Sequence, residues 1–487
     1  MPTPPLHLDP AAGPADDLAD GFRAIRRGLQ LPDGFPPAVE TTARDAATRG
    51  PSDHTDRRDL QDIPFVTVDP PGSTDLDQAL WIGRAPGGGF EVRYAIADVA
   101  AFVTAGDAVD VEARARGTAI YLPDGRVPLH PPVLSEHAAS LRAGQDRPAL
   151  VWQLRLDVDG ELLDSHLERA TVRSRAELDY AGVQRSIDDG TADEVLMLLR
   201  EVGTAREECE HERGGVSLPL PDQQVVRTDG RFGLTYRAPL PVEGWNAQVS
   251  LLAGIAAARI MLDAGVGVLR TLPPPTDDTL ATLRRHARAL GVPWRDGERY
   301  ADVVRSLDMG RSRDAAFATQ AARLFRGAGY LAFDGTPPTG PEGEHAAVAT
   351  HYAHVTAPLR RLVDRFANEV VVAHCAGADV PAWARDALPT MPKLMGAARG
   401  REGSADAMAR DLVEASVLAG RIGDQLSAVV VDLDDRGAQL QVTEPAVLAR
   451  MPADAIGSGH RVALGDAVSV VVHGADVAAR TVDLRVA

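Results

Sequence analysis

The sequence predicts an α+β fold, with a small helical unit before a mixed core of strands and helices and a small OB-type β-barrel after it. Strand-like runs concentrate between residues 56 and 175, whereas helical periodicity dominates from residue 248 to about residue 420. The two patterns do not alternate as they would in a parallel βαβ sheet, which favours α+β. From about residue 424 the pattern changes again. We therefore expect three domains, at residues 1–55, 56–422 and 423–487.

The first 55 residues are expected to hold a flexible leader and a small helical unit. Residues 1–15 are polar and rich in proline, as flexible segments often are. In LADGFRAIRRGLQL the apolar residues recur every three or four positions, which predicts an amphipathic helix. A second short helix is expected in AVETTARDAATR.

In the middle region the runs FVTVD, ALWIG, EVRYAIADV and ALVWQLRLDV predict strands, and Asp229-Gly230 predicts a hairpin turn. Helices are expected in ADEVLMLLREVGTAREECEHER, VSLLAGIAAARIMLDA, DDTLATLRRHARAL and PLRRLVDRFANEVVVAHC. The tail holds about five short alternating runs separated by Asp/Gly turns, which suit a small OB-type barrel. The segment AMARDLVEASVLAGRI predicts a helix that leads into it.

Composition excludes several classes of protein. The chain has 487 residues, of which 45% are hydrophobic and 25% charged, an ordinary globular composition. Cys209 and Cys375 are the only cysteines, too few for a disulfide framework or a four-cysteine zinc site. We find no signal-type apolar segment and no 18-residue apolar run, so we expect a cytoplasmic protein without a membrane span. Nothing indicates an obligate interface, so we expect a monomer.

The net charge of −18 argues against a nucleic-acid binder, because such proteins usually carry a basic surface. A local basic channel can nevertheless coexist with an acidic exterior, and an excess of carboxylates suits divalent cations. Lys393 is the only lysine, so nearly every positive charge belongs to arginine, whose planar fork matches phosphate geometry.

The most informative segment is RRDLQDIPFVTVDPPGSTDLDQALWI. A strand-like run ends at Asp69, a Pro- and Gly-rich loop follows, and Asp75 and Asp77 then alternate. In an extended backbone those two carboxylates point to the same face. If the loop returns that face to Asp69, the three carboxylates would repel one another unless a hard cation such as Mg²⁺ or Mn²⁺ lay between them. On spacing alone, an exposed acidic turn is the alternative.

This segment resembles the signature of the ribonuclease II (RNB) family of exoribonucleases, in which a run of the type D-L-x-x-x-x-F-V-T-I-D precedes aspartates spaced D-x-D-D. By that match Asp69, Asp75 and Asp77 occupy three of four acidic positions, and Gln78 stands at the fourth. The similarity continues through YAIADV…YLPDG, RGGVSLPLPD, VSLLAGIAAA and HYAHVTAPLRRLVD. Departures in the later blocks are Gln248 for glutamate, Gly254 for asparagine and Ala357 for serine.

The resemblance implies an RNB-type catalytic domain that hydrolyses single-stranded RNA from its 3′ end and releases nucleoside 5′-monophosphates. It implies Mg²⁺, with Mn²⁺ possible, held by Asp69, Asp75 and Asp77, with Gln78 offering a carbonyl oxygen, and it makes Asp77 the least replaceable carboxylate. It also implies that Arg360 faces the scissile phosphate and that Tyr121 stacks on a base near the 3′ end. The family's second aromatic clamp is not assigned, because the matching stretch offers only Leu218.

Arg360 and Arg361 follow Pro358, which we expect to begin a helix with Thr356 as its cap. Free backbone N–H groups and both guanidinium groups would then favour RNA phosphate. The alternative, from the residues alone, is a surface arginine pair bonded to Asp364. His351 lies in the same stretch, as does His354, and lone histidines are more often structural.

Two further regions leave alternatives open. The N-terminal helix could contact RNA through Arg23, Arg26 and Arg27, or it could pack on the next domain. The barrel resembles an RNA-binding module but has no Phe, Tyr or Trp from residue 424 onward, so a structural cap is the alternative to RNA tracking through Arg436, Arg450 and Arg461.

For the function, an active exoribonuclease is the leading hypothesis. A catalytically impaired RNA-binding protein of the same fold is the second, motivated by Gln78, Gln248 and Ala357. A metal hydrolase that acts on another phosphodiester, such as a short oligonucleotide, is the third.

Overall fold

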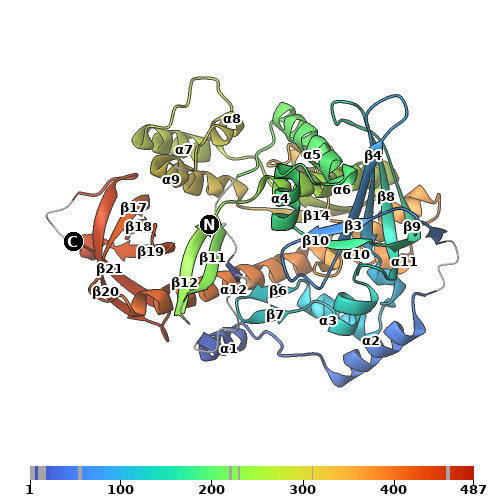
Figure 1. The fold of residues 1–487 in the computed structure, drawn as a ribbon, viewed down its shortest axis with the longest axis horizontal. Helices are drawn as coiled ribbons and strands as arrows, with labels where there is room; N and C mark the ends of the chain where they lie inside the picture. The colour runs from blue at the N-terminus through green and yellow to red at the C-terminus, as the bar shows by residue number, and fades with distance from the viewer. Residues whose placement is uncertain are drawn as a thin grey trace.

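The computed structural model describes residues 6–8, 18–52, 57–218, 222–228, 231–309, 311–456 and 461–487. Figure 1 shows a mixed body of sheet and helices at one end of the molecule and a small set of strands at the other, with the long helix α12 (Met391–Ala419) running between them. This is the α+β arrangement that the sequence predicts.

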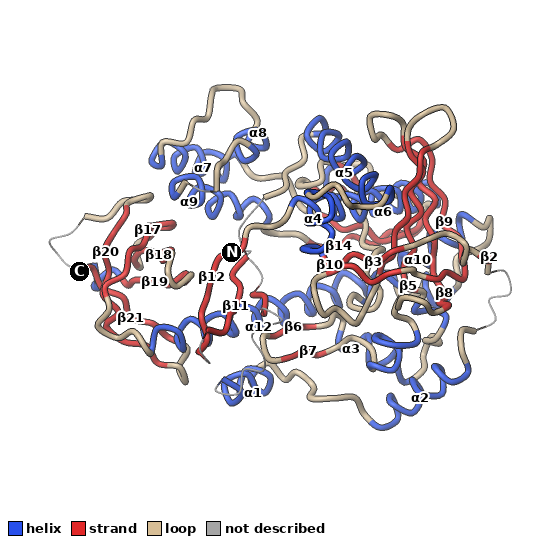
Figure 2. The backbone as a smooth tube through the Cα atoms, viewed as in Figure 1, coloured by secondary structure: helices blue, strands red, loops and turns tan. Residues whose placement is uncertain are grey.

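A seven-stranded sheet forms the centre of the larger body (Figure 2). In spatial order its strands are β10 (Ala176–Asp179), β3 (Val66–Asp69), β4 (Gln78–Arg84), β5 (Phe90–Ala97), β8 (Asp146–Leu156), β9 (Leu162–Arg173) and β2 (Arg58–Asp59). The pairs β10–β3 and β2–β9 are parallel and the others antiparallel. The mixed pairing explains why the sequence shows no regular βαβ alternation.

The sheet is buried on both faces. Along β5, Tyr94 and Ile96 belong to one hydrophobic cluster, whereas Ala95 and Ala97 belong to another, because successive strand residues point to opposite sides. The first cluster includes residues of α4 (Tyr180–Asp188), α5 (Glu194–Arg213), α6 (Pro241–Ala264) and α10 (Leu362–Cys375). The second includes residues of α2 (Pro37–Arg49) and α3 (Ala108–Arg116).

Helix α6 is the one described helix that is long and apolar enough to cross a membrane. No apolar run of that length was expected from the sequence. More than half of its apolar window is buried inside the protein, and buried core helices meet the same criteria of length and composition. The match is therefore weak support for a membrane span.

The C-terminal strands form an antiparallel five-stranded sheet, in the order β19 (Val447–Pro452), β18 (Gly437–Val442), β17 (Gln425–Asp434), β20 (Ala467–Asp476) and β21 (Thr481–Val486). Its buried side chains are aliphatic, for example Val430, Leu440 and Val470. The prediction of a small OB-type barrel of about five strands is confirmed.

The barrel does not stand alone. Its interior belongs to a hydrophobic cluster that also contains residues of α12, of α1 (Ala19–Gly28), of β11 (Asp222–Thr228), of β12 (Arg231–Arg237) and of a small hairpin, β6 (Ile120–Leu122) and β7 (Gly125–Val127). We call this cluster the barrel-side core. The N-terminal helix therefore packs on the neighbouring structure, as one of the two alternatives held.

Strand β1 (Leu6–Leu8) pairs in parallel with β11, although a flexible leader was expected there. The other residues of that expected leader lie outside the described residues. Strands β11 and β12 pair antiparallel as predicted, while the turn residues Asp229 and Gly230 also lie outside the described part of the chain.

A helical unit made of α7 (Asp277–Leu290), α8 (Tyr300–Arg305) and α9 (Ser312–Ala321) packs against the barrel through a cluster that includes Phe317 and Val431. It is flanked by the pair β13 (Val266–Thr271) and β14 (Gly329–Asp334). The remaining short elements are β15 (Glu344–His345), β16 (Thr350–His351) and α11 (Ala382–Arg385). The barrel is thus held on two sides by hydrophobic packing.

Candidate active site

The acidic residues lie where β3 ends and β4 begins. Asp69 is the last residue of β3 and lies in register with Asp179 of β10. The Pro-rich loop then carries Asp75 and Asp77 back to Gln78, the first residue of β4. Val66 of β3 pairs with Leu80 of β4, so the loop returns the chain beside the strand it left. The loop thus returns Asp75 and Asp77 beside the strand that ends at Asp69.

Asp69 is a mostly buried carboxylate. Its Oδ2 atom is buried and has no hydrogen-bond partner. Burial raises the pKa of Asp69 to about 7; the charge of Arg360 opposes this rise, and that of Asp75 adds to it. The free energy of keeping this group ionised would fall if a cation occupied the space beside it.

Asp77 is more deeply buried, with 3% of its surface exposed. Its Oδ1 accepts the backbone N–H of Leu359 at 2.7 Å, and its Oδ2 lies 3.4 Å from Nε of Arg360. Burial raises the pKa of Asp77 to about 8, although Arg360 and the Leu359 N–H both favour the charged form. A buried carboxylate with a raised pKa beside a specific charged partner is a candidate functional group.

Asp75 is bonded to the β6–β7 hairpin. It accepts the hydroxyl of Tyr121 and the guanidinium of Arg126, each at 2.6 Å. Arg126 also bonds Thr74 at 2.7 Å and pairs with Glu136 at 2.5 Å. Arg126 was not among the site residues expected from the sequence. Arg126 comes from a distant part of the chain, and its position directly opposite Tyr121 in the hairpin was the available signal.

Gln78 connects the acidic strand to the segment that carries the arginines. Its amide nitrogen donates to the backbone oxygen of Thr356 at 2.6 Å. This bond engages the nitrogen and not the oxygen through which an amide would hold a cation. An aspartate at this position could not donate the bond.

The segment from Thr356 to Arg361 is a turn, and the prediction of a helix beginning at Pro358 is wrong. Helix α10 begins at Leu362. The hydroxyl of Thr356 accepts from Ser250 at 2.8 Å and does not cap the helix. Instead the carboxylate of Asp364 reaches back to the N–H of Ala357 at 2.7 Å, which closes the turn. The N–H groups expected to be free for phosphate are therefore partly used inside the protein.

The two arginines of this turn have different surroundings. The side chain of Arg361 is 19% exposed and donates two hydrogen bonds to Asp364, at 2.9 and 3.1 Å. Burial opposes its charge, but the Asp364 carboxylate outweighs burial and raises the pKa of Arg361. Arg360 is 44% exposed, and its ion-pair partner within the described part of the chain is Asp77. The alternative of an arginine bonded to Asp364 thus holds for Arg361, while Arg360 faces the acidic cluster.

A pocket of about 200 Å³ opens beside these residues. Tyr121, Arg360 and Arg361 line it, as does His354, which the sequence placed in the same stretch as the arginines. The residues that the sequence did not point to are Arg270, Tyr330, Arg399 and Glu402. Tyr121 is 46% exposed, so its ring is accessible. The pocket therefore has a local basic lining within an acidic protein. Arg399 and Glu402, three positions apart on α12, share a helix face, which was the only signal for them.

His354 is partly buried, and its Nδ1 lies 2.7 Å from the hydroxyl of Tyr330. Burial, followed by the neighbouring arginines Arg361 and Arg270, holds its pKa well below the usual value for histidine. The ring is therefore neutral at ordinary pH and orients Tyr330 at the wall of the pocket. His351 lies in the short strand β16.

Comparison with known families decides the membership of this chain. A model described as "RNB domain" matches residues 57–376, and a model described as "RNase II-type exonuclease C-terminal S1 domain" matches residues 424–487. The chain belongs to the RNB family. Among curated relatives, the exosome complex exonuclease RRP44 homolog A of Arabidopsis thaliana is 30% identical over 336 residues, which cover 65% of this chain and 35% of that protein. Ribonuclease R of Thermotoga maritima is 24% identical over 442 residues, which cover 87% of this chain and 62% of that protein.

The fold agrees with this membership. The apo form of Mycoplasma genitalium RNase R superposes with a TM-score of 0.86 at 20% identity, covering 98% of this chain and 79% of that one. This chain spans about a third of the length of the first Arabidopsis relative and about three fifths of the Thermotoga one.

Nucleases of the RNB family are generally metal-dependent hydrolases. Within the described residues, no three His, Cys, Asp or Glu side chains are grouped closely enough to hold a metal ion. The donor chemistry nevertheless fits a divalent cation, because Asp69 has a buried unpartnered oxygen and Asp75 raises the pKa of both Asp69 and Asp77. For Asp75 to hold a cation together with Asp69 and Asp77, its hydrogen bonds to Arg126 and Tyr121 would have to break.

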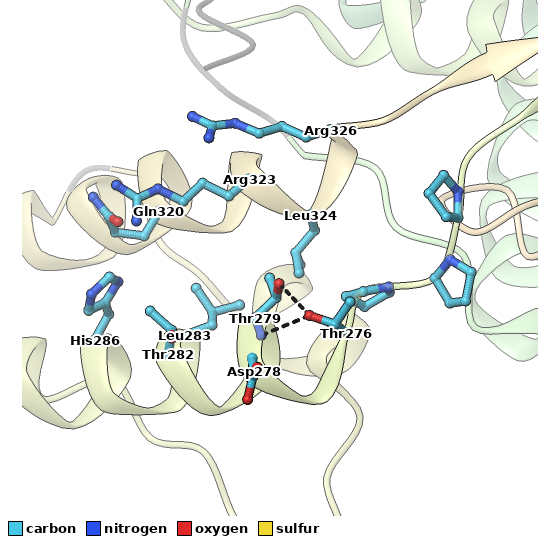
Figure 3. Close-up of a pocket in the computed structure, with 13 residues that line it drawn as sticks. Thr276, Asp278, Thr279, Thr282, Leu283, His286, Gln320, Arg323, Leu324 and Arg326 are labelled. Carbon is cyan, nitrogen blue, oxygen red and sulfur yellow. Dashed lines mark hydrogen bonds between the residues drawn. The ribbon is translucent and has the colours of Figure 1, made fainter.

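A second pocket, of about 450 Å³, lies in the helical unit formed by α7, α8 and α9 and contains none of these residues. Figure 3 shows Arg323 and Gln320 on one wall and Leu283 and His286 on the other, with the Thr276–Thr279 hydrogen bonds at the start of α7. The candidate active site is therefore not the roomiest pocket of this protein, and its chemistry rather than its volume distinguishes it.

Proposed function

We propose that this RNB protein is a 3′→5′ exoribonuclease that hydrolyses single-stranded RNA to nucleoside 5′-monophosphates with Mg²⁺, or in its place Mn²⁺. One observation carries the proposal. Two buried carboxylates with raised pKa values, Asp69 and Asp77, lie beneath a half-exposed arginine, Arg360, at the edge of a basic pocket. Such a combination suits attack on a phosphodiester, because it places a fixed positive charge beside groups that can hold a cation.

Each residue has a role in this proposal. Arg360 faces the scissile phosphate and stabilises the charge that develops on its oxygens. When bound, a divalent cation held by Asp69, Asp75 and Asp77 would supply the positive charge that activates water and supports the leaving oxygen. Asp77 binds both the Leu359 N–H and Arg360, so it fixes the arginine relative to the acidic cluster. Its substitution should therefore have the largest effect.

Tyr121 and the basic lining of the pocket would hold the end of the RNA. The half-exposed ring of Tyr121 suits stacking on a base of any identity. Arg270 and Arg399 lie in the same pocket and add positive charge for phosphate groups. We assign Arg361 and Thr356 to support of the turn, since the first is bonded to Asp364 and the second to Gln78 and Ser250.

The direction of cleavage and the preference for RNA are drawn from family membership. We also propose that residues 56–422 form the catalytic domain, between the helical unit at residues 1–55 and the barrel at residues 423–487. A monomer in the cytoplasm, without a membrane partner, completes the proposal.

The test is an assay with 5′-labelled poly(A) and the purified protein in Mg²⁺, Mn²⁺ or EDTA. We expect a metal-dependent ladder that shortens from the 3′ end, with release of 5′-AMP. A substrate blocked at its 3′ end and a DNA of the same sequence serve as controls. Internal cleavage of the blocked RNA, or equal cleavage of DNA, would contradict the proposal.

The second candidate is an RNA-binding protein of the same fold that has lost catalysis, favoured by Gln78 at an acidic position. Against it, two of the residues that depart from the family pattern, Gln248 and Gln78, make hydrogen bonds of their own here. Gln248 donates to the buried carboxylate of Glu210 at 2.5 Å, where a glutamate would repel it. Gln78 likewise donates to Thr356. Binding of poly(A) without cleavage in every metal condition would favour this candidate.

A further inference from the structure

The β6–β7 hairpin presents two different faces. Ile120, Leu122 and Val127 point inward and belong to the barrel-side core. Tyr121 and Arg126 lie directly opposite each other and occupy the other face, which is exposed or half-buried. The strands have only three residues each, and a two-stranded ribbon of this size is marginally stable by itself. Its position must therefore be set by what it packs on.

Helix α1 holds the tip of this hairpin. Asp124 lies in the turn between the strands, and its carboxylate accepts two hydrogen bonds from the guanidinium of Arg26, at 2.7 and 2.8 Å. The two side chains are 14% and 16% exposed, so the pair is largely shielded from water. Two parallel hydrogen bonds fix direction as well as distance. Phe22 and Ile25 of α1 lie in the barrel-side core together with the inner face of the hairpin.

The outer face of the hairpin reaches the acidic cluster. The Tyr121 hydroxyl and the Arg126 guanidinium both bond Asp75. A chain of contacts therefore runs from Arg26 through Asp124 and the short hairpin to Tyr121 and Asp75. A shift of the hairpin tip would move the aromatic ring and the carboxylate partner together.

We propose that α1 is a positioning element for the active site, and that Arg26 is the positioning residue through which it acts. The ion pair with Asp124 sets the hairpin so that Tyr121 meets the base near the RNA 3′ end. The inference rests on the proposed function, because it concerns the same RNA site. It assigns to the N-terminal helix a role in holding the active site rather than in touching RNA.

The first experiment compares Arg26→Ala with Arg23→Ala. Arg23 lies on the same helix but pairs with Asp20 of that helix, so its loss removes a similar positive charge without releasing the hairpin. We expect kcat/KM for single-stranded RNA to fall about tenfold in Arg26→Ala, because small misplacements of a substrate-contacting group are costly, and to stay unchanged in Arg23→Ala. An equal fall in both variants would mean that α1 acts through its charge on RNA, and the proposal would be wrong.

A double-mutant cycle with Tyr121→Ala separates positioning from a general loss of folding. If Arg26 acts through the hairpin, Arg26→Ala should have a smaller effect once Tyr121 is replaced, and the remaining effect would pass through Arg126 to Asp75. Additive effects of the two substitutions would overturn the proposal, as would wild-type activity of Arg26→Ala. Should Arg26→Ala fail to fold, Asp124→Asn removes the same charge pair with little change of shape and enters the same cycle.

Arg26→Lys provides the conservative comparison. Lysine keeps the charge but loses the two-pronged geometry, so we expect the activity of Arg26→Lys to lie between those of Arg26→Ala and wild type.

If the wild-type protein binds RNA without cleaving it, the same double-mutant cycle is measured from the Kd for 5′-labelled poly(A) in EDTA. Failure of the exonuclease assay therefore tests the proposed function, whereas the cycle tests the role of α1.

Discussion

The acidic turn and the C-terminal barrel differ in the burial and pairing of their charged residues. At the turn, Asp69 and Asp77 are buried, carry raised pKa values, and have Arg360 as their half-exposed cationic neighbour. In the barrel, Arg436 and Arg450 are at the surface, and both pair with Asp434. Burying the carboxylates of the turn costs electrostatic free energy, whereas the surface ion pairs of the barrel change the free energy of folding very little.

The difference supports the proposal that the acidic turn performs the chemistry and that the barrel supplies packing. A costly buried cluster persists only where the surrounding structure holds it, and such clusters concentrate at functional sites. The barrel instead contributes aliphatic side chains to the barrel-side core and to the cluster around Phe317. Variants of the two regions should therefore differ in kind, with loss of activity in the first and small effects in the second.

The largest effect is expected from Asp77→Asn. The asparagine oxygen can still accept the Leu359 N–H, so the turn should remain folded, but the charge facing Arg360 and a cation is lost. We expect kcat to fall by about 10³-fold or more while the Kd for poly(A) in EDTA stays within about threefold. Circular dichroism and Kd measurements are the controls. Near wild-type degradation by this variant would show that the carboxylate assignment is wrong.

A smaller effect should distinguish the two neighbouring arginines. Arg360→Lys keeps a charge but loses the planar fork, and we expect kcat to fall about 10²-fold with the unfolding midpoint unchanged. Arg361→Lys should instead lower the unfolding midpoint, since Arg361 is tied to buried Asp364 by two hydrogen bonds. Single-turnover rates and thermal unfolding of both variants check this. An Arg360 variant that loses stability but not rate would contradict the assignment.

Gln78→Asp should have two effects, one on the Mg²⁺ requirement and one on the stability of the metal-free protein. The aspartate adds a charged ligand, so we expect half-saturation at about tenfold lower Mg²⁺. It also loses the hydrogen bond to the Thr356 carbonyl, so the metal-free protein should unfold at a lower temperature than wild type. Gln78→Asn is the matched control, because it keeps the amide and adds no charge. Unchanged metal half-saturation in Gln78→Asp would mean that position 78 does not face the cation.

The acidic turn should also make stability depend on pH. The folded pKa values of about 7 for Asp69 and about 8 for Asp77 lie above the usual value of an unfolded aspartate, about 3.9. Between these limits the folded state binds more protons than the unfolded state, so the free energy of unfolding falls as pH rises from about 4 to about 8.

In EDTA we therefore expect the unfolding midpoint of wild type to be a few degrees (~3 °C) lower at pH 8 than at pH 6. Asp77→Asn should lose part of this dependence, and added Mg²⁺ should raise the wild-type midpoint more at pH 8 than at pH 6. A wild-type midpoint that rises from pH 6 to pH 8 in EDTA would show that these carboxylates are ionised in the folded protein.

Local patterns in the sequence predicted much of the fold. Helix α7 matches the predicted run from its first residue to its last, and the barrel strands follow their predicted alternation. The resemblance to the RNB family, added to the spacing of the carboxylates, selected Asp69, Asp77 and Arg360, which the structure brings together. Periodicity and turn chemistry are local properties, so a single sequence suffices for them.

The features that were missed depend on contacts between distant residues. The start of α10 moved to Leu362 because Asp364 closes the preceding turn onto Ala357. Arg126 lies 51 positions from Asp75, and Arg26 lies 98 positions from Asp124. No periodicity links such pairs, and only the folded chain places them within hydrogen-bond distance.

The smallest effect is expected from the barrel. Arg436→Ala together with Arg450→Ala removes two charges that Asp434 already partly neutralises, so we expect the slope of log Kd for poly(A) against log salt to change by less than about half a unit. Arg399→Ala, in the candidate active-site pocket, removes one charge and should change that slope by about one unit if Arg399 contacts a phosphate.

Asp434→Ala sharpens the comparison, because it frees both barrel arginines and should make the slope steeper only if RNA passes over that surface. A change of about two units in the Arg436→Ala, Arg450→Ala variant would mean that the barrel follows the RNA backbone, and packing would then be only part of its role.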